Sequence, residues 1–235
     1  MVKEATVLVT ARSIQPDIVK ALPYDNGGID MENGDVQIRT LVYIDSMQPQ
    51  YAAITGAMVN GSVPVEGMSE LYLEVSPGVE IFRAMNIALK SSGVKPGYQR
   101  VERQFGMMEA HSYSQSDIRE AASAILEAYG LSEEKIQRPE VISKQVVSKI
   151  DPYQAQIINR TSKGALLLPG ESLFILEVKP AGYIVYSANE AEKDANIKIV
   201  DYRSAGIYGR LYVAGQESEV KAAMDATIAA IERIG

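Results

Sequence analysis

The sequence predicts an α+β protein built from two copies of one domain-sized unit. Residues 67–106 align with residues 170–209 at a constant offset of 103 positions, and 13 of the 40 aligned pairs are identical. Short apolar runs in both copies alternate with segments whose apolar residues recur at helical spacing, which predicts strands and helices in alternation. Units of this size are domains and not the repeats of a solenoid. Each unit is expected to form an antiparallel or mixed sheet covered by helices, in the order β-α-β-α-β-β-α.

The first strand of each unit is expected at residues 37–45 and 141–151, where β-branched residues are frequent. Both segments end in Ile-Asp and are followed by a Gln-x-Gln motif. When the two copies are aligned on these matches, the offset between them is 106 positions. Since the offset is 103 further along, the second copy is predicted to lack three residues between the two regions. A short helix should follow in each copy, at residues 46–58 and 152–162.

The second strand of each unit is a short apolar run that contains Leu-Glu-Val, as expected for a buried strand. Pro77 and Pro180 follow these runs, and proline is favoured at the first position of a helix. Each predicted helix carries one apolar stripe. The stripe consists of Ile81, Met85, Ala88 and Leu89 in the first copy, and of Ile184, Ala188, Ala191 and Ala195 in the second.

A strand, a turn that ends in Gly106 or Gly209, another strand and a final helix complete each copy. The final helices are expected at residues 115–129 and 217–233. Residues 131–138 are charged and lack periodicity, so they are read as the linker. The predicted domains are therefore residues 37–136 and 137–235.

Residues 1–36 have no counterpart in the second half and are read as an N-terminal extension. Within it, Thr6–Thr10 is a candidate strand and Asp17–Leu22 a candidate helical turn. The extension also contains Asn-Gly pairs, which are typical of turns.

Composition excludes several classes of function. The net charge is −7 and no Lys/Arg-rich run is present, so binding to nucleic acid is not expected. The absence of cysteine excludes disulfides and thiolate metal sites. No signal peptide is recognisable, and no stretch reaches the roughly 18 apolar residues that suggest a membrane span. The expected location is the cytoplasm, without a membrane partner.

An enzyme is the function that the residues support least. His111 is the single histidine, which excludes a histidine metal cluster, and a lone histidine in a predicted strand is usually structural. No nucleophile elbow, P-loop or dinucleotide-binding motif occurs. We therefore expect no catalytic residues, no metal and no cofactor.

The most informative difference between the copies lies before the glycine of the turn. The charged pair of the first copy is replaced by small residues in the second, while the aromatic residue and the glycine are kept. From the pattern alone, an exposed loop with an incidental ion pair is favoured. The two segments are Val101, Glu102, Arg103, Gln104, Phe105 and Gly106, and Ser204, Ala205, Gly206, Ile207, Tyr208 and Gly209.

Lys90 and Lys193 each end an Asn-x-Ala-x-Lys motif between the Leu-Glu-Val strand and the glycine of the turn. In this setting each unit resembles the ferredoxin-like bacterial microcompartment (BMC) shell domain. Because a strand and a helix precede the Glu-Val strand, each unit is similar to the circularly permuted form. Residues 37–235 also share motifs with the carboxysome-type tandem shell proteins (the CcmP type). These motifs are Tyr43-Ile-Asp45, Glu74-Val-Ser-Pro-Gly78, Val101-Glu-Arg103, Ile158-Asn-Arg160 and Pro180-Ala-Gly-Tyr183.

The resemblance implies a homotrimer whose six domains form a pseudohexagonal tile in the shell facet, beside hexameric and pentameric shell proteins. It implies a central pore for small metabolites, and two trimers that can stack face to face. Lys90 and Lys193 match lysines that contact neighbouring tiles. The pore residues would be Glu102, Arg103, Gln104, Phe105 and Gly106, with Ser204, Ala205 and Gly206 from the second loop.

A gate made of Glu102 and Arg103 is energetically suited to switching. Exposed ion pairs contribute roughly 0–1 kcal/mol each, so three of them leave an open and a closed state both populated. Glu102→Ala is expected to favour the open pore. The alternative prediction is a small-molecule-binding regulator made of tandem ferredoxin-like domains, which would remain a discrete oligomer.

Overall fold

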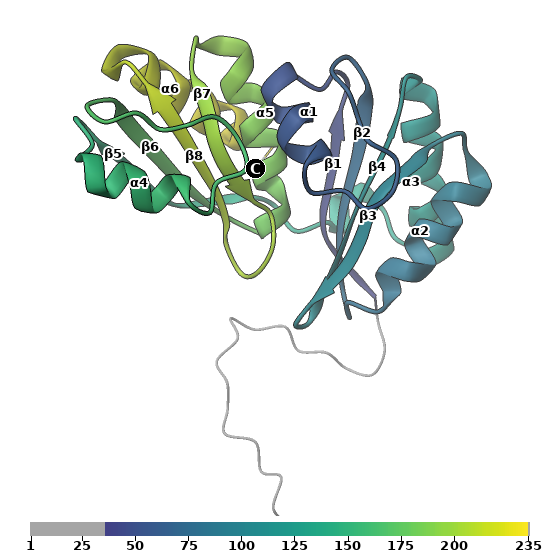
Figure 1. Cartoon of the computed structure of the whole chain (residues 1–235). Coiled ribbons are helices and arrows are strands. Elements are labelled where there is room, and N and C mark those ends of the chain that lie inside the picture. The colour runs from purple at the N-terminus through teal and green to yellow at the C-terminus, as the bar shows by residue number, and fades with distance from the viewer. Residues whose placement is uncertain (1–35, 235) are drawn as a thin grey trace, which may run out of the picture. The chain divides into compact units, whose positions relative to one another are not determined.

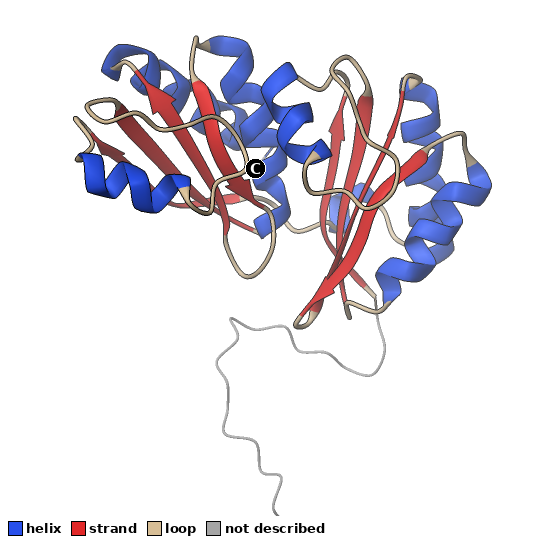
Figure 2. Ribbon diagram, in the orientation of Figure 1, coloured by secondary structure: helices blue, strands red, loops and turns tan. Residues whose placement is uncertain are grey.

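The computed structural model describes residues 36–234, and the expected strand at Thr6–Thr10 and turn at Asp17–Leu22 lie outside this range. The described chain forms two four-stranded antiparallel sheets, each with two long helices on one face and one short helix on the other (Figure 1, Figure 2). The predicted α+β class is confirmed. So is the element order, which is the same in both units.

In the first unit, the strand order in the sheet is β1-β2-β4-β3. Its elements are β1 (Gln37–Ile44), α1 (Pro49–Gly56), β2 (Ser69–Ser76), α2 (Glu80–Ser91), β3 (Lys95–Glu102), β4 (Phe105–Ser112) and α3 (Gln115–Tyr129).

In the second unit, the strand order is β5-β6-β8-β7. A 3-10 turn at η2 (Glu133–Lys135) connects it to the first unit. Its elements are β5 (Glu140–Val147), α4 (Pro152–Asn159), β6 (Ser172–Lys179), η3 (Ala181–Tyr183), α5 (Ile184–Asp194), β7 (Lys198–Arg203), β8 (Gly209–Gly215) and α6 (Glu217–Ile234).

The two units match at the offset of 103 from their first strand onward. β1 and β5 both have eight residues, and both contain an irregularity after their second residue, at 38–40 and at 141–143. The predicted offset of 106 and the three-residue deletion are therefore wrong. The two Ile-Asp pairs are not equivalent, because Asp151 stands where the first unit has Gln48, at the residue before the helix. A two-residue match is too short to establish an alignment.

The helices begin and end where local chemistry dictates. α1 starts at Pro49 and not at residue 46, because proline has no N–H to leave unsatisfied at a helix start. α3 begins after Ser114, whose side chain accepts a hydrogen bond from the N–H of Asp117, and it ends at Gly130 with φ +63°. β5 ends at Val147, four residues before the predicted end.

The apolar stripes of α2 and α5 pack on their sheets with one exception in each. Ile81, Met85 and Ala88 are buried against β2 and β4, but Leu89 is exposed, contrary to the prediction. Ile184, Ala188 and Ala191 are buried in the second unit, and the stripe's last residue, Ala195, lies just beyond the helix and is half-buried.

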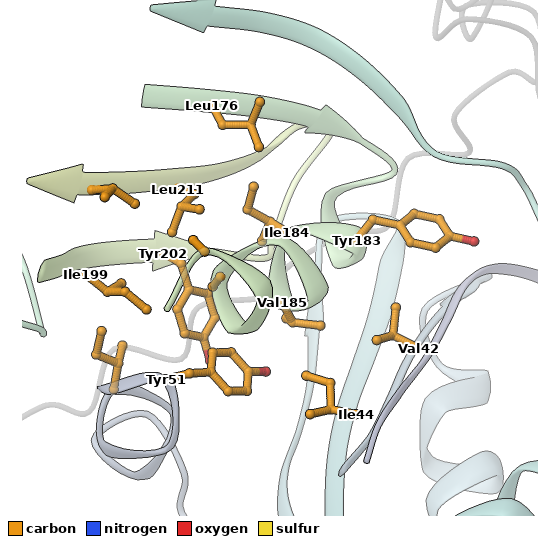
Figure 3. Close-up of a cluster of buried hydrophobic side chains, with 14 of the residues drawn as sticks. Val42, Ile44, Tyr51, Leu176, Tyr183, Ile184, Val185, Ile199, Tyr202 and Leu211 are labelled. Carbon is orange, nitrogen blue, oxygen red and sulfur yellow. The ribbon is translucent and has the colours of Figure 1, made fainter. Parts of the chain in front are cut away.

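A large apolar cluster crosses from the first unit to the second (Figure 3). Val42, Ile44 and Tyr51 of the first unit pack against residues of the second, among them Tyr183 and Tyr202. We call this contact between the two units of one chain the seam.

Candidate functional site

The seam contains a helix that is capped by the other unit. α1 has no side-chain cap of its own, and the first N–H groups of a helix need acceptors. The N–H of Gln48 donates to Oδ1 of Asn189 (2.8 Å), and those of Gln50 and Tyr51 donate to the Glu192 carboxylate (2.9 and 3.0 Å). A carboxylate at a helix N-terminus is also favoured by the helix dipole.

Further contacts join α1 to β7 and to the residue before it. The Gln50 side chain donates to Ile197 O (2.9 Å) and accepts from the N–H of Ile199 (2.9 Å), as a neighbouring strand would. Tyr51 stacks on Tyr202, with ring centroids 5.3 Å apart. The seam is thus held by specific polar groups as well as by apolar burial.

The first candidate loop is the tight turn between β3 and β4. Glu102 pairs with Phe105 across the turn, and Arg103 has φ +56°, in the left-handed region. Glu102, Arg103 and Gln104 are exposed. Phe105 and Gly106 are buried and belong to β4, so Gly106 does not end the turn as predicted. A Cβ on Gly106 would lie 2.1 Å from the carbonyl oxygen of Gly78, which explains the glycine.

The base of this turn is held by a buried ion pair. The irregularity at residues 38–40 directs both Arg39 and Thr40 toward the carboxylate of Glu74. The Arg39 guanidinium also lies over the Phe105 ring, 3.6 Å from its centroid, and Glu74 accepts from the N–H of Gly182 in the second unit (3.1 Å). Burial raises the pKa of Glu74, and Arg39 opposes that shift. Phe105 is therefore anchored while the tip of the turn is free.

The second candidate loop, residues 204–208, joins β7 to β8. Gly206 has φ +97°, a conformation that favours glycine. Ser204 is buried, and its carbonyl oxygen accepts a hydrogen bond from the Tyr72 hydroxyl (3.0 Å). Ala205 packs against the seam cluster, and Gly206 is half-exposed. Both loops lie at the lower ends of their sheets in Figure 1.

The two candidate lysines occupy matching positions with different surroundings. Lys90 is exposed near the end of α2 and has no ion-pair partner among residues 36–234. Lys193, near the end of α5, has its Nζ 2.5 Å from Oε1 of Glu190. Lys193 also lines a groove of about 610 Å³ beside the seam, together with Tyr43, Tyr183 and other residues.

A buried acidic cluster in the first unit was not predicted from the sequence. Glu70 accepts from the Tyr51 hydroxyl (2.7 Å), and Glu109 lies 2.8 Å from Nδ1 of His111. Nε2 of His111 lies 3.1 Å from the Ser62 hydroxyl. Burial raises the pKa of both carboxyls, and it lowers the pKa of His111 to about 4. The signal in the sequence was the presence of charged residues within otherwise apolar strands.

Within the described part of the chain, no group of three or more His, Cys, Asp or Glu side chains could hold a metal ion. None of the described helices is both long and apolar enough to cross a membrane.

Comparison with known proteins gives matches in both units. The family model described as the CsoS1D N-terminal domain matches residues 38–135, and the model described as the BMC domain matches residues 172–235. The carboxysome shell protein CcmP of Synechococcus elongatus is 43% identical over 199 residues, which cover 85% of this chain and 93% of CcmP. The carboxysome shell protein CsoS1D of Hydrogenovibrio crunogenus is 42% identical over 200 residues, 85% of this chain and 98% of that protein.

Two solved structures share the fold along most of their length. The fused permuted hexameric shell protein of the RMM microcompartment has a TM-score of 0.81 and 40% identity, and the match covers 84% of this chain and 98% of that one. The double ringed trimeric shell protein of the same microcompartment has a TM-score of 0.81 and 38% identity, with 85% and 97% covered.

Proposed function

This chain belongs to the family of microcompartment shell proteins with two permuted BMC domains, and we propose that three copies close into a pseudohexagonal shell tile with a gated pore. The family includes the carboxysome proteins CcmP and CsoS1D, and one structural relative is a double ringed trimer. The proposed partners are two further copies of the chain, hexameric and pentameric shell proteins, and small metabolites that cross the pore.

The proposal rests mainly on the exposure of the residues that correspond, at the offset of 103, to the buried residues of the seam. In a ring of three chains, the second unit of one chain contacts the first unit of the next chain. This contact should resemble the seam, in which the two units of one chain meet. Counterparts of the buried seam residues must then be exposed in the single chain. Ile54 is 2% exposed in the seam, and its counterpart Ile157 is 68% exposed. Val185 is fully buried, and its counterpart Phe82 is 49% exposed.

The same correspondence explains other exposed apolar residues. Val79 is the counterpart of Gly182, Ile142 of Arg39, and Leu89 of Glu192, and all three are exposed. Leu89 therefore belongs to the surface that meets the next chain and not to the core of its own unit. Apolar surface of this kind marks a protein interface.

The polar contacts change in a compatible way. Asn86 is the counterpart of Asn189, so it can accept from the N–H of Asp151 as Asn189 accepts from Gln48. Leu89 cannot replace the Glu192 carboxylate as a helix cap. α4 does not need it, because Asp151 caps α4 by accepting from the N–H of Tyr153 (2.8 Å).

A threefold ring brings both candidate loops of every chain to one axis. The exposed tip at Glu102, Arg103 and Gln104 supplies bulk and charge that can close the pore. The second loop presents Ala205 and Gly206, which leave a wide opening when the first loop withdraws. Phe105, Gly106 and Ser204 support these loops from the interior.

We also propose that trimers stack through two apolar loops. Val63 and Val65 are exposed in the first unit, and their counterparts Leu166 and Leu168 are exposed in the second. The seam covers one side of the first unit and the opposite side of the second unit, and it leaves both pairs exposed. The contact between chains would cover the two remaining sides. Because each of these sides corresponds to a side that the seam covers in the other unit, this contact should leave both pairs exposed as well. A trimer would thus display six apolar loops on one face, a surface that a second trimer can cover.

Light scattering after size-exclusion chromatography tests both contacts. Ile157→Asp places a charge in the contact between chains and is expected to give single chains of 25.6 kDa. Leu168→Asp is the matched control, because it lies outside that contact and should split stacked trimers into single trimers. A monomeric native protein, or an Ile157→Asp variant that remains trimeric, would contradict the proposal.

A further inference from the structure

The two candidate loops are not held in the same way. The hydroxyl of Tyr72 donates to the carbonyl oxygen of Ser204 (3.0 Å), and both residues are buried in the seam. Burial raises the pKa of Tyr72, so the hydroxyl stays protonated and remains a donor. This bond ties the start of the second loop to β2, one of the two central strands of the first unit.

In the proposed ring, the contact between chains would have no equivalent bond. The counterpart of Tyr72 is Ile175, whose side chain has no hydrogen-bond donor. The counterpart of Ser204 is Val101, which is exposed in the single chain. In that ring, the start of the first loop would meet an aliphatic side chain where the second loop meets a hydroxyl.

Motion of the first loop is limited at its other end. Phe105 is buried under the Arg39 guanidinium, and Gly106 lies against the backbone of Gly78. Residues 101–104 precede this anchor and are all exposed. Val101 and Glu102 are still paired with Gly106 and Phe105 at the end of β3, so only Arg103 and Gln104 lie outside the ladder. The side chains at the tip, Glu102, Arg103 and Gln104, are exposed.

We propose that the second loop is a fixed wall of the pore, held in place by the positioning residue Tyr72, so that the motion of the proposed gate is confined to the exposed side chains of Glu102, Arg103 and Gln104. The inference about the first loop rests on the proposed ring. The inference about Tyr72 concerns one chain and stands without it. Opening and closing would then change three tips per trimer and leave the other three loops in place.

The absence of cysteine allows each loop to be labelled singly. Gln104→Cys and Ile207→Cys place a nitroxide spin label on the first and second loop, at two exposed positions. Electron paramagnetic resonance spectra of the full-length protein report the mobility of each label. We expect the label at position 104 to be mobile and the label at position 207 to be several-fold slower.

Tyr72→Phe removes the hydroxyl alone and should mobilise the label at position 207 several-fold, without changing the label at position 104. Tyr183→Phe is the matched control, since it removes a seam hydroxyl that donates to another carbonyl oxygen, that of Gln137 (2.7 Å). It should leave both labels unchanged.

Equal mobility of the two labels in the otherwise native chain would overturn the proposal. So would an unchanged label at position 207 in Tyr72→Phe, or an equal response to Tyr183→Phe. Light scattering on the same samples reports separately whether the ring forms, so failure of the ring and failure of the Tyr72 anchor are distinguishable.

Discussion

At the scale of single residues, two buried carboxyl groups in the first unit each have one oxygen without a hydrogen bond. Oε1 of Glu70 and Oε2 of Glu109 have no hydrogen-bond partner among the described residues. The counterparts of Glu70, Glu109 and His111 are Leu173, Tyr212 and Ala214, so the cluster belongs to the first unit alone. Because it reaches Tyr51, ionisation there acts on the seam.

The cluster predicts that stability falls as pH rises. Burial raises the folded-state pKa of Glu70 and Glu109 above the unfolded value of 4.5, so the folded chain holds more protons than the unfolded chain in this range. Their contribution is complete below the unfolded pKa and is lost as pH rises through the folded one. The slope reaches about 1.4 kcal/mol per pH unit for each group.

Measurements above about pH 7.5 isolate the carboxyls, because the ordinary pKa of histidine is 6.5, that of His111 is lowered to about 4, and the ring is then largely neutral in both states. Chemical denaturation at several pH values should show a shallower loss of stability for Glu109→Gln than for the native chain. Glu120→Gln, at an exposed position, is the control. Identical slopes in all three proteins would show that the pair does not titrate there.

At the scale of elements, the two short helices satisfy the N–H groups of their first turn with acceptors from different places. α4 uses its own Asp151 as a cap, whereas α1 uses Glu192 from the other unit. α1 is therefore formed fully only when the seam is closed. The cap of α4 is visible in the local sequence, because Asp151 directly precedes the helix, whereas the cap of α1 is not, because Glu192 is far away in the chain.

Glu192→Ala should loosen α1 and leave α4 intact. Loss of a capping acceptor typically costs about 0.5–2 kcal/mol. Hydrogen exchange of amides in Pro49–Gly56 should accelerate, while Pro152–Asn159 keeps its protection. Asp151→Ala should give the reverse pattern, and a variant that affects both helices equally would argue against separate caps.

At the scale of the whole molecule, the edges of the proposed tile are chemically unequal. Lys193 is held by Glu190, whose carboxylate also lies 3.7 Å from Arg233, whereas Lys90 has no ion-pair partner among the described residues. Layer formation distinguishes a shell tile from a regulator that remains a discrete oligomer.

Lys90→Ala should impair layers more than Lys193→Ala, because Lys193 is already engaged within its own chain. Electron microscopy of concentrated protein measures the extent of ordered layers for each variant. Glu190→Gln should release Lys193 and make the two edges more alike. Equal loss of layers in both lysine variants would contradict the inequality, and the absence of layers in the native protein would favour the regulator.

The sequence was sufficient for the duplicated unit, the element order and a turn between the last two strands of each unit. It was insufficient for the alignment of the first strand and first helix between the units, because the recurring Ile-Asp pair suggested an offset of 106 where the structure has 103. It also did not show that Phe105, Gly106 and Ser204 are interior residues. Their burial depends on Arg39, Gly78 and Tyr72, which lie far away in the chain.

Hydrophobic periodicity and internal repetition are local signals, and they establish here a chain of two like α+β units. Which face of each unit is covered is not a local property. The bonds that close the seam join residues such as Gln48 and Asn189, which are 141 positions apart. The tertiary structure therefore determines that one contact of this kind forms within the chain. The corresponding surfaces on the outer sides of the two units remain exposed in the single chain.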